Sequence, residues 1–321
     1  MARVDETLAV DRSTIWPYDA SGDPRAFFYT RYAHPTGAAA ENALGELEGG
    51  NALLYGSGTA AATAVMLSFA RPGMTIALAE GAYFGTSILL RELAAWGLEL
   101  IEYDQTGPPP AADIVWVESP ANPTLTMPNW DALKGCSSLI VCDATVSTPV
   151  FLHALEAGAD IVVHSATKFL TGHHNALLGA TITRDPTHTD RLLTIRGRAG
   201  LSASPDAAGA LLAGLETLDE RMARITASAT EIARRLEGHP DVATVRYPGF
   251  SGLISFDVAD PRRVETRTRL ITNATSLGGA ISTMESRHRW EGDRIPKGLL
   301  RLSVGLESVD DLWEDLTEAL S

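Results

Sequence analysis

The chain has 321 residues and a formal net charge of −14 at pH 7, with 40 acidic against 26 basic side chains. Because nucleic acids and anionic membrane surfaces repel so acidic a protein, the charge argues against both as partners. Hydrophobic residues make up 45% and charged residues 21%, as in a globular protein long enough for two domains.

Targeting signals and cysteines indicate the compartment. Residues 1–14 have no basic stretch followed by an apolar one, so we expect no secretory signal, and no run reaches the ~20 apolar residues of a membrane span. The two cysteines are Cys136 and Cys142. We expect buried free thiols, since a metal site needs more ligands, and this favours a cytoplasmic location.

The first 34 residues combine turn-formers and aromatics without a helical or strand period. The clusters Trp16-Pro17-Tyr18 and Phe27-Phe28-Tyr29 flank the turn signal Ser21-Gly22-Asp23-Pro24. A single globular unit would not readily bury so irregular a segment. We therefore predict an N-terminal arm over residues 1–34.

From residue 36 onward, predicted strands and helices alternate. The strands are expected at residues 52–55, 75–79, 98–103, 114–117, 139–141 and 161–163, and the helices at residues 36–47, 86–96 and 130–133, with a further helix ending at Phe69. This alternation predicts a mainly parallel sheet with both faces covered, and it gathers functional residues at the strand ends.

One turn in this series has the make-up of a phosphate site. Gly56-Ser57-Gly58-Thr59 lies between a strand and the N-terminus of an apolar helix. Free backbone N–H groups and the helix dipole would face the anion there, and Ser57 adds a hydroxyl. A plain strand-to-helix turn is the alternative.

Lys168 follows the β-branched strand 161–163 and is flanked by Ser165, Thr167 and Gly172. A lysine near the end of a buried strand is costly unless it is paired or neutral. Desolvation lowers its pKa, which makes the amine a better nucleophile for Schiff-base chemistry. We interpret Lys168 as a catalytic amine, with an exposed turn lysine as the alternative.

Two further strand ends carry polar groups. Asp143 follows an apolar strand 25 residues before Lys168, which leaves room for one crossover to the adjoining strand. Asn122 lies between Pro120 and Pro123, and its amide is available to a ligand oxygen. A helix cap or Asx turn is the alternative for Asp143.

The pattern changes from Asp206 onward and predicts a smaller α/β domain. Long amphipathic helices are expected over residues 207–237, strands at 243–247, 253–258 and 299–304, and helices at 262–271 and 309–320. The segment from Glu285 to Lys297 is predicted to be a polar loop.

Taken together, the motifs resemble the Cys/Met-metabolism enzymes of pyridoxal phosphate (PLP) fold type I, which include cystathionine γ-synthase, cystathionine γ-lyase, cystathionine β-lyase and methionine γ-lyase. The likeness runs in order from Phe28 to the end of the chain. The matching segments are Phe28 to Arg31, Pro35-Thr36, Leu47-Glu48-Gly49, Ser57-Gly58, Tyr83, Glu118 to Pro123, Asp143, Ala159 to Lys168, Gly172-His173, Thr217-Leu218, Arg221-Met222, Tyr247-Pro248-Gly249, Ser276 to Gly279 and Arg301 to Glu307.

The resemblance implies an α/β fold like that of aspartate aminotransferase. A large PLP-binding domain over residues 35–218 would contain a mainly parallel seven-stranded sheet, and a smaller α/β domain would cover residues 219–321. It also implies a homo-oligomer, a tetramer of two catalytic dimers, in which the arm 1–34 contacts a neighbouring subunit.

The resemblance also implies roles for individual residues. Lys168 would bind PLP through a Schiff base, Asp143 would pair with the pyridine nitrogen, and Tyr83 would stack on the ring and act in acid-base steps. The phosphate would be held by Ser57, Gly58, Thr59, Ser165 and Thr167, with Tyr29 and Arg31 reaching it from a neighbouring subunit.

On the substrate side, the resemblance implies that Arg301 clamps the carboxylate of an amino acid, assisted by Ser276 and Asn122 beside Thr275. Alternatives exist for each residue taken singly. Tyr83 also suits a half-buried packing position, and Arg301 suits a strand whose face is ambiguous. Tyr29 and Arg31 are also compatible with surface positions.

Several positions depart from the family pattern. Thr275 and Ile281 stand where cystathionine-acting members typically carry Glu, which weakens the case for cystathionine as substrate. Gly85 stands where methionine γ-lyases have cysteine. Ala144 and Asn175 replace the Asn and Asp of two further motifs.

We therefore predict a PLP-dependent enzyme that eliminates a γ-substituent from a small sulfur- or oxygen-substituted amino acid, as cystathionine γ-lyase does. The alternatives are a γ-replacement synthase that uses an O-acylated homoserine, a β-eliminating enzyme, and, in a different class, a non-catalytic PLP-binding paralogue. No metal ion is expected.

Overall fold

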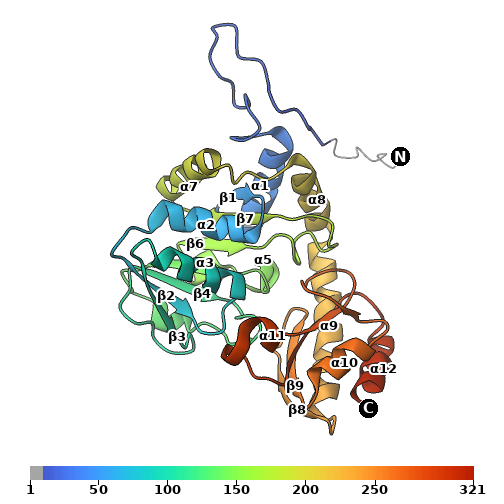
Figure 1. Cartoon of the computed structure of the whole chain (residues 1–321). Coiled ribbons are helices and arrows are strands. Elements are labelled where there is room, and N and C mark those ends of the chain that lie inside the picture. The colour runs from blue at the N-terminus through green and yellow to red at the C-terminus, as the bar shows by residue number, and fades with distance from the viewer. Residues whose placement is uncertain (1–9) are drawn as a thin grey trace, which may run out of the picture.

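The computed structural model describes residues 10–321 and contains two β-sheets surrounded by helices (Figure 1). Residues 1–9 of the predicted arm lie outside the described residues. The first sheet has seven strands in the order β1-β7-β6-β5-β4-β2-β3, and the second has five in the order β10-β11-β12-β9-β8. The seven-stranded sheet predicted for the first half of the chain is confirmed.

The first sheet is parallel except at β7, which pairs antiparallel with both β1 and β6. Its strands are β1 (Asn51–Tyr55), β2 (Thr75–Ala79), β3 (Glu99–Tyr103), β4 (Ile114–Glu118), β5 (Leu139–Asp143), β6 (Ile161–His164) and β7 (Gly179–Thr183). The central strands β4, β5 and β6 are neighbours, so their carboxyl ends meet at one edge.

Helices cover both faces of this sheet. They are α1 (Pro35–Glu48), α2 (Gly58–Phe69), α3 (Phe84–Ala94), α4 (Trp130–Leu133), α5 (Thr148–Phe151), α6 (Ala154–Ala157), α7 (Pro186–Ala199) and α8 (Pro205–Glu216). Ser57 caps α2 by accepting a hydrogen bond from the Ala60 N–H at 3.0 Å, which fixes where the helix begins. Among the helices of residues 10–321, none combines the length and the apolar composition that a membrane crossing requires.

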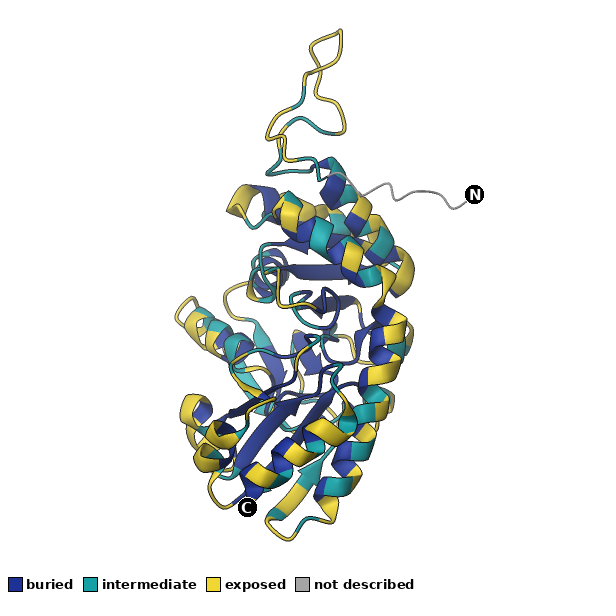
Figure 2. Cartoon of the chain, turned by 90° about the vertical axis from the view of Figure 1, so that its right-hand side faces the viewer, coloured by how far each residue is buried: buried dark blue, intermediate teal, exposed yellow. Residues whose placement is uncertain are grey.

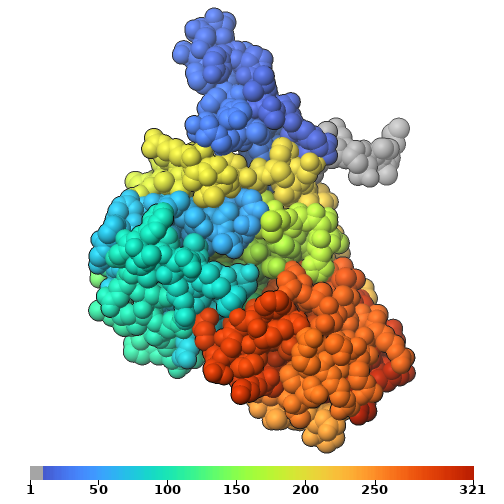
Figure 3. All heavy atoms as spheres, viewed as in Figure 1, coloured from blue at the N-terminus to red at the C-terminus, as the bar shows by residue number. Residues whose placement is uncertain are grey.

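The long helix α9 (Leu218–Glu237) leads from the first sheet to the second (Figure 1). Around the second sheet the remaining elements are β8 (Val242–Arg246), β9 (Leu253–Val258), α10 (Pro261–Arg267), β10 (Thr272–Asn273), β11 (Thr283–Ser286), α11 (His288–Glu291), the short 3-10 helix η1 (Gly292–Arg294), β12 (Leu299–Ser303) and α12 (Val309–Leu320). The C-terminal part of the chain is seated against the first part (Figure 3).

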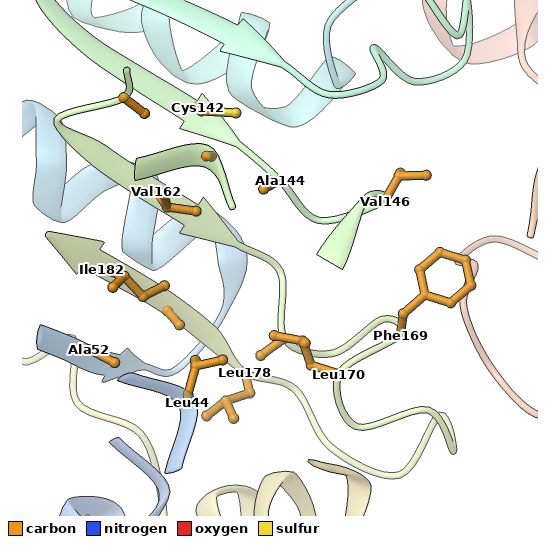
Figure 4. Packing of buried hydrophobic residues seen from close by; sticks show 14 of the residues in the cluster. Leu44, Ala52, Cys142, Ala144, Val146, Val162, Phe169, Leu170, Leu178 and Ile182 are labelled. Atoms are coloured by element: carbon orange, nitrogen blue, oxygen red, sulfur yellow. The ribbon is translucent and has the colours of Figure 1, made fainter. Parts of the chain in front are cut away.

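The hydrophobic core follows the sheet faces. The strands are buried while the helices expose one side, and the described part of the arm is largely exposed (Figure 2). One face of the first sheet packs Leu44, Val162 and Ile182 together, and the same cluster continues to Phe169 beyond the strands (Figure 4). Leu253 of β9 belongs to this cluster too, so the two sheets share a core near the turn that carries Lys168.

Two expectations about secondary structure were wrong. The segment after Glu285 is not a polar loop, because Thr283–Ser286 forms strand β11 and His288–Glu291 forms helix α11. Strand β7 was missing from the six strands located by periodicity. Of the two cysteines expected to be buried, Cys142 is buried but Cys136 is exposed, and both are free.

The domain boundary at residue 218 stays a prediction. Helix α9 begins there, but the buried cluster that includes Leu170 also includes Met222 and Ile225 of α9. The start of α9 is therefore packed on the first sheet and its later turns on the second.

We predict that Phe169→Ala destabilises the protein. Phe169 is fully buried in the shared core, so its loss leaves a cavity that costs about 3–5 kcal/mol. Urea unfolding followed by fluorescence should show a clearly lower midpoint. As a control, Trp96→Ala removes an aromatic side chain that is 68% exposed and should change stability by less than about 0.5 kcal/mol. Equal midpoints for the two variants would contradict this placement of the core.

Candidate active site

A cavity of about 360 Å³ opens where the carboxyl ends of the first sheet face the segments around β11 and β12. Twelve residues predicted from the sequence line it: Ser57, Gly58, Thr59, Tyr83, Asn122, Asp143, Ser165, Thr167, Lys168, Thr275, Ser276 and Arg301. The further lining residues include Glu118, Thr145, Leu177, Arg287 and Trp290, none of which was among the predicted site residues.

Lys168 lies on the turn that follows β6 and reaches across the cavity. Its Nζ donates a hydrogen bond to the Ser276 Oγ at 2.7 Å. The turn is held by Arg221 of α9, whose Nη1 donates to the Phe169 carbonyl at 2.8 Å. Burial, followed by the positive charges of Arg301 and Arg287, lowers the pKa of Lys168 to about 8. A substantial fraction of the amine is therefore neutral near pH 7–8, as a nucleophile requires.

Ser276 meets the lysine with a strained backbone. Its φ is 96°, a left-handed value that non-glycine residues rarely adopt, at a cost on the order of 1–3 kcal/mol. The Ser276 carbonyl accepts from the Arg301 Nη2 at 2.9 Å, and the N–H of Gly278 donates to the Ser303 Oγ at 2.8 Å. These bonds hold the segment in place beside Lys168.

The turn between β1 and α2 has the form of an anion cradle. Ser57, Gly58 and Thr59 line the cavity at the N-terminus of α2, where backbone N–H groups are free of helical partners. Gly179 of β7 packs so closely under this turn that a Cβ there would lie 2.0 Å from the Ser57 carbonyl oxygen. The glycine thus lets β7 support the cradle from below.

The two hydroxyls that follow β6 differ in what they already bind. The Thr167 hydroxyl donates to the Leu178 carbonyl at 3.1 Å and accepts from the Leu178 N–H at 2.8 Å. The Ser165 N–H donates to the Thr145 Oγ1 at 2.8 Å. Thr167 therefore uses its hydroxyl to fix the turn, which limits what it can offer a ligand, whereas the hydrogen bond given for Ser165 involves its backbone.

Asp143 ends β5 directly opposite Glu118 at the end of β4. Its Oδ1 accepts from the N–H and the hydroxyl of Thr145 at 3.0 and 2.5 Å, which fixes the carboxylate at the cavity floor. Burial raises the pKa of Asp143, and the Thr145 hydrogen bonds oppose that rise. A buried carboxylate of this kind is stabilised by a cationic partner in the cavity.

Glu118 holds two predicted site residues in place. Its Oε2 accepts from the N–H of Tyr83 at 2.6 Å, and its Oε1 accepts from the N–H of Asn122 at 3.1 Å. Burial, reinforced by the charge of Asp143, raises the pKa of Glu118 well above its usual value. The sequence placed Glu118 at a strand end, and that position was the signal that could have marked it.

Tyr83 is 41% exposed at the cavity mouth. Its ring lies against Gly85, where an added Cβ would come within 2.5 Å of the Tyr83 Cε1. A cysteine at position 85 would therefore displace the ring from this position. The Gly85 departure and the Tyr83 placement are thus two aspects of one geometry.

Arg301 of β12 is 3% exposed and is anchored on several sides. Its Nη1 donates to the Asn122 Oδ1 at 3.2 Å, and its Nη2 donates to the Ser276 carbonyl and, at 3.3 Å, to the Glu285 Oε2. The Nε is buried without a partner among the described residues. Burial, followed by the charge of Arg287, lowers the pKa of Arg301 to about 10, so the side chain stays cationic at neutral pH. A ligand carboxylate would satisfy the free Nε.

Tyr29 and Arg31 are not brought to this cavity within one chain. Both lie in the arm, where the Arg31 Nη1 donates to the Gly197 carbonyl at 2.7 Å and the guanidinium stacks 4.9 Å from the centre of the Tyr32 ring. The arm projects from the body of the molecule (Figure 1).

The family model of the Cys/Met metabolism PLP-dependent enzymes matches residues 6–321. The chain belongs to this family. It is 40% identical to an L-methionine γ-lyase of Streptomyces avermitilis, over 98% of this chain and 80% of that protein. It is 33% identical to a cystathionine γ-lyase of Bacillus subtilis, over 94% and 90% of the two chains.

The solved structures agree. A cystathionine γ-synthase of Xanthomonas oryzae in complex with aminoacrylate and cysteine superposes with a TM-score of 0.92 at 31% identity, covering 97% of this chain and 92% of that one. The predicted family, the fold type I architecture and the PLP cofactor are therefore confirmed, and the protein is an enzyme of the Cys/Met metabolism family.

The cavity of this family member fits PLP on its own features. The α2 N-terminus offers N–H groups and hydroxyls to a phosphate, the buried Asp143 suits a protonated ring nitrogen, and the Lys168 amine, with its lowered pKa, suits a covalent link. These three features line one cavity, about as large as a small-molecule site requires.

The lowered pKa of Lys168 makes a direct prediction. In cofactor-free protein, acetylation of Lys168 by acetic anhydride should rise with pH and reach half of its maximum rate at about pH 8, because only the neutral amine reacts. The chain has three lysines, Lys134, Lys168 and Lys297, so peptide mass spectrometry assigns each label. Nα-acetyl-lysine amide, with a pKa near 10.4, provides the reference. A Lys168 profile that coincides with this reference would contradict the desolvated amine.

Proposed function

We propose that the protein eliminates a γ-substituent from a small amino acid that carries sulfur or oxygen at Cγ. The observation that carries the proposal is the convergence of Lys168, Asp143, Tyr83 and Arg301 on one cavity, with the amine of Lys168 partly neutral near physiological pH. The curated relatives named as methionine and cystathionine γ-lyases support elimination over replacement.

Arg301 gives the reaction its orientation. Its cationic guanidinium, with Nε left free, would bind the α-carboxylate, and Asn122 on its Nη1 fixes the plane of the fork. The substrate Cα would then face Lys168, which shares the Ser276 segment with Arg301. A carboxylate fixed at one end thus places the protons of Cα and Cβ within reach of one base.

PLP, when bound, withdraws electrons from Cα so that the protons on Cα and Cβ become acidic and the γ-substituent can leave. Lys168 would move these protons, since an amine with a pKa of about 8 both accepts and returns a proton near neutral pH. Tyr83 stands at the mouth, where its hydroxyl would donate a proton to the leaving group. Asp143 would keep the ring nitrogen protonated.

The substituent at Cγ is proposed to be small and uncharged. Thr275, which replaces a typical Glu, donates its hydroxyl to the Glu285 Oε1 at 2.8 Å and offers no negative charge to a distal ammonium group. The indole of Trp290 and the side chain of Leu177 add apolar surface to the cavity lining. A methylthio or short acyloxy group suits this lining better than the zwitterionic end of cystathionine.

Replacement by a thiol remains the second candidate, because relatives in the same family are named as cystathionine γ-synthases, one of them bound to cysteine. A non-catalytic role is disfavoured by the retention of every group that the chemistry needs. Elimination and replacement differ only in what captures the product, so a substrate panel separates them.

For the assembly, we propose a homo-oligomer, a tetramer of two catalytic dimers, in which Tyr29 and Arg31 reach the phosphate cradle of a neighbouring subunit. The extended arm and its exposed aromatic residues support this, because within one chain the arm has little to pack against. The two free cysteines support a cytoplasmic location. The division into an arm (1–34), a large domain (35–218) and a small domain (219–321) belongs to the same proposal.

The function is tested with methionine, homocysteine, cystathionine and O-acetylhomoserine, each with and without an added thiol. We expect a 2-oxo acid from methionine or O-acetylhomoserine without thiol, and Lys168→Ala should lower the rate by at least about 10³-fold. A thioether product formed only with thiol would instead support the synthase. No turnover of any substrate by protein that carries PLP would contradict both.

The arm is tested with Arg31→Ala. If Arg31 binds the phosphate of a neighbouring subunit, the loss of a charge-assisted contact should weaken PLP binding by about tenfold or more. Absorbance titration of cofactor-free protein measures this affinity. Arg25→Ala, an exposed arginine of the same arm, is the matched control and should leave the affinity unchanged. Equal affinities for Arg31→Ala and the parent protein would count against the proposed arrangement.

A further inference from the structure

One buried carboxylate behind the cavity, that of Glu285, has no assigned part in the chemistry. Glu285 lies on β11, directly opposite Arg301 on β12, and is 1% exposed. Four residues that line the cavity donate hydrogen bonds to it: Thr275 at 2.8 Å and Trp290 at 2.7 Å to Oε1, and Arg287 at 2.9 Å and Arg301 at 3.3 Å to Oε2. One acid thus organises a whole wall of the site.

The charges around Glu285 explain why an acid is needed there. Arg287 and Arg301 are both buried, and both guanidinium groups meet the same Glu285 oxygen. Without that oxygen, two desolvated cations would repel each other at short range. Burial alone would raise the pKa of Glu285, but the Thr275 hydrogen bond and the charges of Arg301 and Arg287 outweigh it and lower that pKa. The carboxylate is therefore ionised at neutral pH.

Glu285 also fixes where Arg301 points. Its bond to Nη2 and the Asn122 bond to Nη1 hold two corners of the guanidinium, and the buried Nε is the donor left without a partner. Through Thr275, the same acid restrains the residue next to Ser276, on which Lys168 and Arg301 both converge. The orientation of the carboxylate clamp and the position of the lysine contact are tied to one side chain.

Glu285 is poorly placed to bind a substrate ammonium itself. Both of its oxygens already accept hydrogen bonds, two on Oε1 from Thr275 and Trp290 and two on Oε2 from the arginines. An amine would have to displace these donors from a site that is almost closed to solvent.

We propose that Glu285 is a positioning residue, which neutralises the Arg287–Arg301 pair and orients Arg301 for the α-carboxylate of the substrate. This deepens the proposed function and rests on it for the identity of the site, but not for the fate of the γ-substituent. Arg301 touches the substrate, and Glu285 acts through Arg301.

The test uses L-norvaline, an amino acid without a γ leaving group, and its amide, which lacks the carboxylate charge. Binding of each to the PLP-loaded enzyme is followed by the absorption change of the cofactor, so no turnover is needed. Glu285→Gln should weaken norvaline by about tenfold or more and leave norvalinamide within about threefold, because only the former needs an oriented Arg301.

The matched control is Glu291→Gln. Glu291 is a second buried acid, and its Oε1 pairs with Arg287 at 2.9 Å. It should leave the norvaline-to-norvalinamide ratio near that of the parent enzyme. Equal weakening of both ligands by Glu285→Gln, or the same selective loss in Glu291→Gln, would overturn the positioning role.

Should Glu285→Gln fail to fold, Glu285→Asp keeps the charge but withdraws it by one methylene. An intermediate loss of norvaline affinity, again without loss of norvalinamide affinity, is then expected. Unchanged norvaline affinity in Glu285→Asp would overturn the proposal. A parent enzyme that binds PLP and norvaline but turns over no γ-substituted substrate would refute the proposed function and leave the role of Glu285 intact.

Discussion

The hydrogen bond from the Lys168 amine to the Ser276 hydroxyl is the contact on which the site depends, since it joins the two sheets across the cavity. The lysine comes from the edge of the first sheet, where the ends of β4, β5 and β6 also deliver Glu118, Asp143 and Ser165. The serine comes from the segment before β11. The shared core around Phe169 keeps these two edges together, and a small change in that packing would open the contact.

Electrostatics set the chemistry of the cavity against that of the whole molecule. The protein is strongly acidic, yet Lys168, Arg287 and Arg301 gather in one cavity. Each of these cations is desolvated, so each depends on a nearby acid or gives up charge. The arginines keep their charge because Glu285 pairs with both of them, whereas Lys168 is stripped of solvent and drifts toward neutrality. The difference produces a carboxylate receptor and a nucleophile side by side.

Much of the first sheet could be predicted from the sequence, because buried parallel strands are written as continuous apolar runs. Ile161–His164 and Leu139–Asp143 are examples, and the polar residues that follow them marked the site. Strand β7 escaped because Gly179 and its threonines lack that signature. Its glycine is needed where the strand packs under Ser57, a long-range contact that periodicity does not report.

Strand β11 escaped for the opposite reason, since its sequence Thr283-Met284-Glu285-Ser286 looks solvated and is fully buried. The polar groups inside are paired by partners distant along the chain, Glu285 with Arg301 and Ser286 with Glu265. A pattern rule assigns such residues to the surface, because it cannot see the partners that make their burial tolerable. The Glu lost at position 275 and the Glu buried at position 285 therefore differ in effect. A carboxylate at 275 would stand in the cavity lining, where a substrate could use its charge, whereas at 285 the charge is spent on the arginines. The enzyme keeps an acid in this wall of the site but directs it at its own side chains.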